Sequence, residues 1–113
     1  MKLTGRAKML RVHIGANDRW KGEPLHLALV KRFHELDLAG ATVYQGMEGY
    51  GASGRIHRQP TFRSGDEPVT VVVVDTAEKV EHAMPYLDEM VGSGLVAISD
   101  VDVILYRATK EIA

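Results

Sequence analysis

The sequence predicts a single α+β domain whose strands and helices follow one another in the order βαββαβ. Alternating apolar and polar residues at 8–14 and 101–106, and a β-branched run at 69–74, are typical of strands. Apolar residues recur at helical spacing between residues 25 and 36 and again between 80 and 91. A length of 113 residues suits one domain, so residues 1–113 are taken as one folded unit.

The first half of the chain is expected to form a strand, a helix and a second strand. The strand at 8–14 has two unlike faces, one with Leu10, Val12 and Ile14 and the other with Met9, Arg11 and His13. A turn-rich loop follows from Gly15 to Glu23, and Pro24 suits the first position of a helix, where the missing N–H costs nothing. Gly40 is expected to end that helix, and Ala41–Glu48 to form the next strand.

The second half is expected to begin with a long exposed loop, Arg55–Pro68, which contains prolines and glycine but no helical stripe. After the β-branched strand, Asp75 with Glu78 three residues later predicts a helix cap. Pro85 should kink the helix that follows, because its ring displaces a backbone hydrogen bond. Glycines at 92 and 94 should end the helix before the last strand.

This order of elements is the split βαβ or ferredoxin-like arrangement, a four-stranded antiparallel sheet with two helices on one face. The opposite face of the sheet is expected to carry Met9, Arg11, His13, Ile104 and Tyr106. Such a mixed face is too apolar for plain solvent, so we expect it to form a contact between copies of the chain.

Composition excludes several classes of function. The chain has no cysteine, which excludes disulfides and thiolate metal sites. Its net charge of −1 argues against nucleic acid as a partner. The sequence contains neither an apolar run long enough to span a membrane nor the apolar core of a signal peptide, so a cytoplasmic location is expected.

The glycine-rich stretch GMEGYGASGRIH at 46–57 is the strongest functional signal. It matches the G-x-G-x-x-G spacing of a dinucleotide-binding turn, but that motif requires a helix at its third glycine, and Pro60 and Gly65 exclude a stable one. It also lacks the G-K-[ST] ending of a P-loop. Glycine backbone amides followed by basic side chains still favour an anion, although a solvated hairpin loop explains the same residues.

Three blocks carry a resemblance to a known family: GEPLHLALVKRFHELDLAGATVYQGMEGYGASGRIH, VTVVVVDTAEKVEHAMPYLDEMV and GLVAISDVDVILY. Together they resemble the PII-like proteins of domain-of-unknown-function family 190, over residues 7–107. That family is distantly similar to the nitrogen-regulatory PII proteins. The resemblance implies a homotrimer without enzymatic activity that binds adenine nucleotides in clefts between subunits and contacts target proteins through a long T-loop.

The resemblance also implies particular site residues. Gly49, Tyr50 and Gly51 match the glycine–aromatic–glycine at the base of the T-loop, and Arg55 is close to a phosphate-facing basic position. The T-loop corresponds to residues 52–68. The expected ligand-binding set is Gly49, Tyr50, Gly51, Ala52, Ser53, Gly54, Arg55 and Arg107, and the expected partner-binding residues are His57, Arg58, Phe62 and Arg63. No cofactor is required, and a bound adenine nucleotide is the expected ligand.

Two features separate the chain from the PII proteins, and two rival functions stay open. The sequence GSGLVAISD replaces the lysine-rich phosphate loop that follows the second helix in PII proteins, and few residues follow Arg107. The regulated target, a membrane transporter or a metabolic enzyme, is not identified by the sequence. The first rival is a CutA-like trimer that binds metal or anions through the histidines at 13, 26, 34, 57 and 82, although none of them has ligand spacing. The second is a small hydrolase that uses Ser53 and His57.

Overall fold

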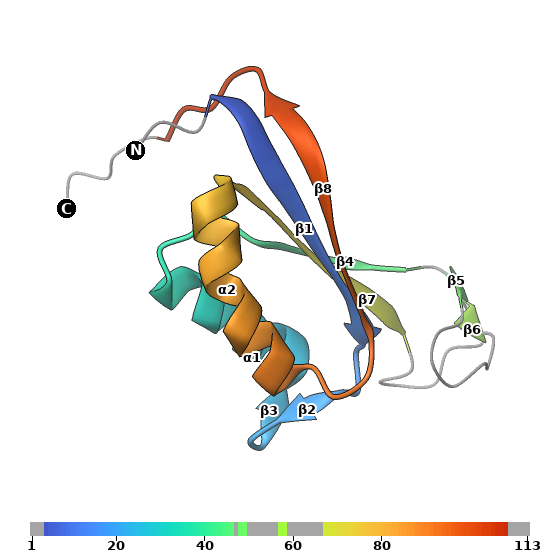
Figure 1. Ribbon diagram of the computed structural model, residues 1–113. Coiled ribbons are helices and arrows are strands. Elements are labelled where there is room, and N and C mark those ends of the chain that lie inside the picture. Colours follow the sequence, from blue (N-terminus) through green and yellow to red (C-terminus); the bar gives the residue numbers. More distant parts are fainter. Residues whose placement is uncertain (1–3, 47, 50–56, 59–66, 109–113) are drawn as a thin grey trace.

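A four-stranded sheet, fully antiparallel, with strand order β4-β7-β1-β8, organises the chain (Figure 1). The computed structural model describes residues 4–46, 48–49, 57–58 and 67–108. Its main elements are β1 (Gly5–Gly15), α1 (Leu25–Glu35), β4 (Thr42–Gln45), β7 (Pro68–Asp75), α2 (Ala77–Met90) and β8 (Leu95–Val103). This confirms the ferredoxin-like βαββαβ prediction. Three antiparallel ladders, β1 with β7, β1 with β8 and β4 with β7, make β1 and β7 the central strands.

Both helices pack on the same face of the sheet and bury the core between the two layers (Figure 1). Side chains alternate along a strand, so every second residue of β1 and β7 points toward the helices. The core therefore contains Leu10, Val12, Ile14, Val69, Val71 and Val73 from the sheet, and Leu25, Leu29, Phe33, Val80, Leu87 and Met90 from the helices.

The last strand differs from its prediction at both ends. β8 begins at Leu95 rather than Val101 because Gly94 brings the chain directly against β1, where a Cβ would lie 2.6 Å from the His13 carbonyl oxygen. It ends at Val103, which pairs with Gly5 at the start of β1. Ile104 and Tyr106 therefore lie beyond the sheet rather than on its open face, while Met9, Arg11 and His13 do lie there.

The first helix ends earlier than predicted. It stops at Glu35, and Asp37 rather than Gly40 takes the left-handed backbone conformation, with φ of 61°. The Lys79 ammonium donates to the Asp37 carbonyl oxygen at 2.9 Å and lies 3.4 Å from its carboxylate. A contact from Lys79 on α2 thus stabilises the left-handed conformation of Asp37, whereas sequence propensity alone predicts a glycine for this conformation.

Two short ladders occur mostly within segments that were predicted as loops, and they also include Pro24, predicted as a helix start, and Glu48, predicted as the end of a strand. β2 (Arg19–Trp20) pairs with β3 (Glu23–Pro24) within the loop after β1. Trp20 is half-buried and packs against the core, and the Lys21 ammonium lies 5.2 Å from the centre of its ring. The side chain therefore closes one end of the core. β5 (Glu48–Gly49) pairs with β6 (His57–Arg58). The predicted second strand, Ala41–Glu48, is correspondingly shorter, because β4 covers only Thr42–Gln45.

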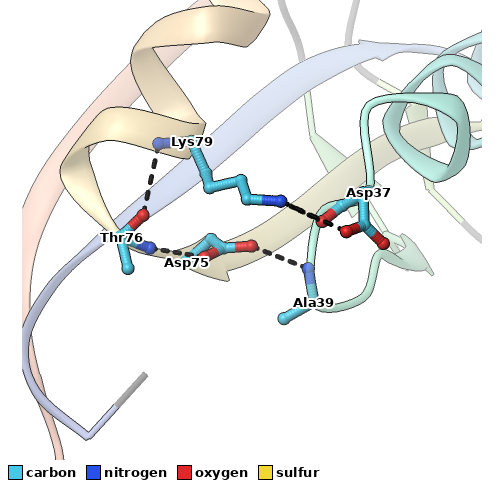
Figure 2. A network of polar contacts seen from close by, with 5 residues as sticks. All are labelled: Asp37, Ala39, Asp75, Thr76 and Lys79. Atoms are coloured by element: carbon cyan, nitrogen blue, oxygen red, sulfur yellow. Dashed lines mark hydrogen bonds and ion pairs between the residues drawn. The ribbon is translucent and has the colours of Figure 1, made fainter. Parts of the chain in front are cut away.

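A fully buried carboxylate, Asp75, ties the two βα halves together (Figure 2). One of its oxygens accepts from the Thr76 backbone N–H at 2.6 Å, and the other accepts from the Ala39 backbone N–H at 2.7 Å. The helix cap is Thr76, one residue later than predicted, and its hydroxyl accepts from the Lys79 N–H at 3.2 Å. Glu78 is exposed and does not complete the predicted capping box. α2 runs through Pro85 to Met90 without a break.

A ladder of ion pairs joins β1 to β8 where these strands extend past the end of β7. Lys8 and Arg6 face Asp100 and Asp102 across the pair, in the register Lys8 with Asp100 and Arg6 with Asp102. Lys8 donates to the Asp100 carboxylate, and Arg6 Nε lies 3.1 Å from Asp102. All four side chains contact solvent, so the ladder contributes more to register than to stability.

Replacing Asp75 by alanine is expected to lower the free energy of unfolding by about 2–4 kcal/mol, because two part-buried backbone N–H groups lose their acceptor. Urea denaturation followed by circular dichroism measures the change. Glu78→Gln is the matched control on the same turn and should change stability by less than about 0.5 kcal/mol. Equal stability of the two variants would contradict the role given to Asp75.

The pKa of Asp100 is expected below the ordinary value of 3.8, because Lys8 hydrogen-bonds to its carboxylate and adds its positive charge. Stability from a lowered pKa is present above the unfolded pKa and is lost as the pH falls through the folded one. A carboxyl NMR titration should show the Asp100 pKa rising in Lys8→Met. Lys31→Met, which removes a lysine paired with Glu23, should leave it unchanged.

Candidate functional site

The glycine-rich segment between β4 and β7, residues 46–67, is called the excursion below. Backbone hydrogen bonds close its base. The Gly46 N–H donates to the Pro68 carbonyl oxygen at 2.7 Å, and the Ala16 N–H donates to the Glu67 carbonyl oxygen at 2.9 Å. A Cβ at position 46 would lie 2.7 Å from Pro68 Cγ, so only glycine fits without a shift of the backbone or the ring. The backbone of Gly46 and Pro68 therefore holds the two ends of the excursion close together. This contact is called the Gly46–Pro68 gate below.

A second closure lies farther along the same excursion. In the β5–β6 ladder, Glu48 pairs with Arg58 and Gly49 pairs with His57. This ladder brackets residues 50–56, which contain most of the GYGASGR motif. Figure 1 shows it beyond the ends of β4 and β7, away from both helices. The excursion is thus anchored twice, once at the sheet and once at the ladder.

The predicted site residues are only partly within the described chain. Gly49, His57 and Arg58 belong to the β5–β6 ladder, which brings the predicted ligand segment and the predicted partner segment side by side. Tyr50, Gly51, Ala52, Ser53, Gly54 and Arg55 lie outside the described residues, as do Phe62 and Arg63. Their assignment remains a prediction.

Arg107 is exposed and follows the end of β8. Figure 1 shows that the segment after β8 and the β5–β6 ladder lie at opposite sides of the molecule. A single chain therefore does not bring Arg107 to Gly49. The two can share a site only if another copy of the chain supplies one of them.

The histidines do not gather into a metal centre within the described part of the chain, where no group of three His, Asp or Glu side chains could hold an ion. His13 Nδ1 lies 3.0 Å from the Thr70 hydroxyl on the open face of the sheet. His26, His34 and His82 are distributed over the two helices. Ser53, the proposed hydrolase nucleophile, lies outside the described residues.

Sequence reasoning missed the gate at Gly46 and Pro68. A signal was present, because a glycine follows one strand and a proline opens the next at the two ends of the same excursion. Gly46 is separated by twenty-two positions from Pro68, and only the pairing of β4 with β7 brings them together.

Fold and loop closures together define a ferredoxin-like domain with a long, doubly anchored excursion between its second and third main strands. Comparison with known sequences gives the family. The chain belongs to DUF190, described as "Uncharacterized ACR", which matches residues 7–103. A UPF0166 protein of Aquifex aeolicus is 33% identical over 100 residues, 86% of this chain and 92% of that protein. A UPF0166 protein of Methanocaldococcus jannaschii is also 33% identical over 100 residues, 87% and 92% of the two chains.

Solved structures share the fold at low sequence identity. A PII-like signalling protein from Thermus thermophilus superposes with a TM-score of 0.67 at 16% identity, covering 92% of this chain and 94% of that one. CPII from Thiomonas intermedia, a nitrogen regulatory PII-like protein bound to ADP, AMP and bicarbonate, gives 0.58 at 18%, covering 87% and 88%. The divalent ion tolerance protein CutA1 from Ehrlichia chaffeensis gives 0.57 at 12%, covering 91% and 86%.

Across the described residues, neither helix has the length and apolar character needed to cross a membrane.

Replacing Gly46 by alanine is expected to lower the free energy of unfolding by about 1–3 kcal/mol, because the new methyl group would overlap the Pro68 ring. Gly40→Ala is the control, since a Cβ there meets no described atom within 4 Å. Thermal unfolding compares the two variants. A destabilisation by Gly40→Ala as large as that by Gly46→Ala would show that the gate has no special packing.

Proposed function

We propose that this protein is a non-enzymatic PII-like regulator that binds an adenine nucleotide at the base of its excursion and acts on a partner protein through residues 52–68. The observation that carries the proposal is the double anchoring of a glycine- and arginine-rich segment, at the Gly46–Pro68 gate and at the β5–β6 ladder. Anchors of this kind couple a ligand held at the base to the position of the segment beyond it.

The ligand class is supported by chemistry and by likeness. Glycine backbone amides approach an anion closely, and Arg55 and Arg58 add positive charge within the same stretch. CPII, which shares the fold, is bound to ADP and AMP. Adenine nucleotides are therefore the first ligands to test.

The assembly we propose is a homotrimer with ligand sites between subunits. Three features of the described chain support contact between copies: the open sheet face, the edge strand β8 and the segment after it. Tyr44, Leu95 and Ile104 expose 59%, 60% and 85% of their surface. Exposed apolar edge strands pair readily with other chains. Contact between copies could also bring Arg107 of one chain to Gly49 of another.

The proposed activity is regulation in the cytoplasm, with no bond made or broken. The target, a membrane transporter or a metabolic enzyme, stays to be identified. A CutA-like metal- or anion-binding trimer is the rival, and CutA1 shares the fold as CPII does. The two proposals differ in the ligand, so a binding experiment separates them.

Replacing Arg55 by alanine is expected to weaken nucleotide binding by about 1.5–3 kcal/mol, which is about tenfold to 150-fold in Kd, because a charged hydrogen-bond partner of the phosphates is lost. Isothermal titration calorimetry with AMP, ADP, ATP and cyclic nucleotides measures the affinity. Lys21→Ala, which removes a surface cation from the β2–β3 turn, is the control and should not change it.

The same titrations with divalent metal salts test the rival. Metal binding that is lost in histidine-to-alanine variants, without any nucleotide binding, would replace the regulator by a metal-handling protein. Light scattering should give a mass of about three times 12.5 kDa. A monomer at all concentrations would contradict the assembly.

A further inference from the structure

The open face of the sheet, which the helices do not cover, is almost free of charge. The strand registers define its rows: Tyr44, Thr70, His13 and Leu95; Thr42, Val72, Arg11 and Ala97; Val74, Met9 and Ser99; Ala7 and Val101. A sheet face that stays in water normally carries polar and charged residues, which alternate along each strand with the apolar residues of the core face. Among the described residues, Arg11 is the only Lys, Arg, Asp or Glu on this face.

Arg11 occupies the middle of this surface without a counter-charge. It is exposed, and its neighbours in the row are Val72 and Ala97, neither of which can accept a hydrogen bond through its side chain. No hydrogen bond or ion pair joins Arg11 to any described residue. A guanidinium stays protonated in proteins, so Arg11 carries its charge wherever this face is placed.

If the open face of the sheet is buried between copies of the chain, the charge of Arg11 therefore requires an anion beside it. This step rests on the proposed function, in which copies of the chain meet over this face. A buried charge without a partner costs several kcal/mol, and a carboxylate or another oxyanion offsets that cost by accepting two parallel hydrogen bonds.

The described carboxylates of the chain are committed elsewhere. Asp100 and Asp102 pair with Lys8 and Arg6 on the opposite side of the sheet, and Asp75 lies buried under the helices. The remaining described acids lie off the open face. Partners in their own chain hold Asp18, Glu23, Glu35, Asp37 and Glu67, while Glu78, Glu81, Asp88 and Glu89 lie on α2, on the covered side, and Glu48 belongs to the separate β5–β6 ladder. On the described chain, none of these carboxylates lies on the open face beside Arg11.

His13 adds a second group beside Arg11. The two residues share the open face at positions two apart on β1, about 7 Å along the strand. The Thr70 hydroxyl lies 3.0 Å from His13 Nδ1, which fixes the ring. When Thr70 donates to Nδ1, Nε2 carries the ring proton and is free to donate to an anion.

We propose that Arg11, assisted by His13, binds an oxyanion on the open face of the sheet, and that this anion is held where copies of the chain meet. The site is separate from the nucleotide site at the base of the excursion. Its ligand class is a small oxyanion such as inorganic phosphate.

The experiment measures the mass and the thermal midpoint of the full chain in chloride and in inorganic phosphate at equal ionic strength. We expect phosphate to raise Tm by about 4 °C in the wild type, because a ligand of the folded state stabilises it. Arg11→Met should lose that shift, Arg11→Lys should keep part of it, and His13→Gln should reduce it. Arg19→Met removes an exposed arginine whose side chain donates to the Gly22 carbonyl oxygen in the β2–β3 turn, so it should keep the full shift.

Two results would overturn the proposal. A phosphate shift equal in the wild type and Arg11→Met places any anion elsewhere. A wild type that does not respond to phosphate, with Arg11→Met dissociating into monomers, assigns the counter-charge to a carboxylate of a neighbouring copy. Besides these two results, a monomeric wild type would overturn the placement of the anion between copies, together with the proposed assembly. Calorimetry with nucleotide in Arg11→Met tests the regulator separately, because that affinity should be unchanged.

Discussion

The junction between the two βα halves depends on the two hydrogen bonds accepted by the buried Asp75 carboxylate. One bond fixes the start of α2 directly after β7, and the other holds the backbone of Ala39 between α1 and β4. This side chain adds a buried polar link between the two βα halves, which the strand ladders and the shared core also join. Since β4 leads into the excursion and β7 leads out of it, the Gly46–Pro68 gate depends on the same connection. A buried charge with two well-aligned backbone donors gives this junction one defined geometry.

The order of main elements could be predicted because each has a strong local pattern. The run Val69–Val74 is β-branched throughout, as expected of a strand with neighbours on both sides, and α1 and α2 show clear apolar stripes. The ends of elements depend on distant contacts instead. Asp37 adopts a left-handed conformation because Lys79 of the other helix bonds to it, and β8 starts at Leu95 because Gly94 meets β1. Neither contact is visible in the local sequence.

The candidate site was predictable only as a segment. The glycines and arginines after residue 46 indicated an anion, and the likeness to PII-like proteins indicated a nucleotide. The closing contact between Gly46 and Pro68 was missed because it joins residues that only the pairing of β4 with β7 brings together. For the open face of the sheet, the residues could be predicted but their surroundings could not. Alternation in the sequence placed Met9, Arg11 and His13 there correctly, but only the registers of β4, β7 and β8 showed how little charge surrounds Arg11.

The central position of β1 also has a consequence for how the chain folds during synthesis. Residues 5–15 are synthesised before their two neighbours in the sheet, because β7 and β8 lie much later in the chain. Until residue 103 is available, one side of β1 stays unpaired, and nascent chains must keep this apolar strand from associating with others. Pairings between strands far apart in the sequence close slowly, so the domain is expected to complete its fold only after residue 103 has been translated.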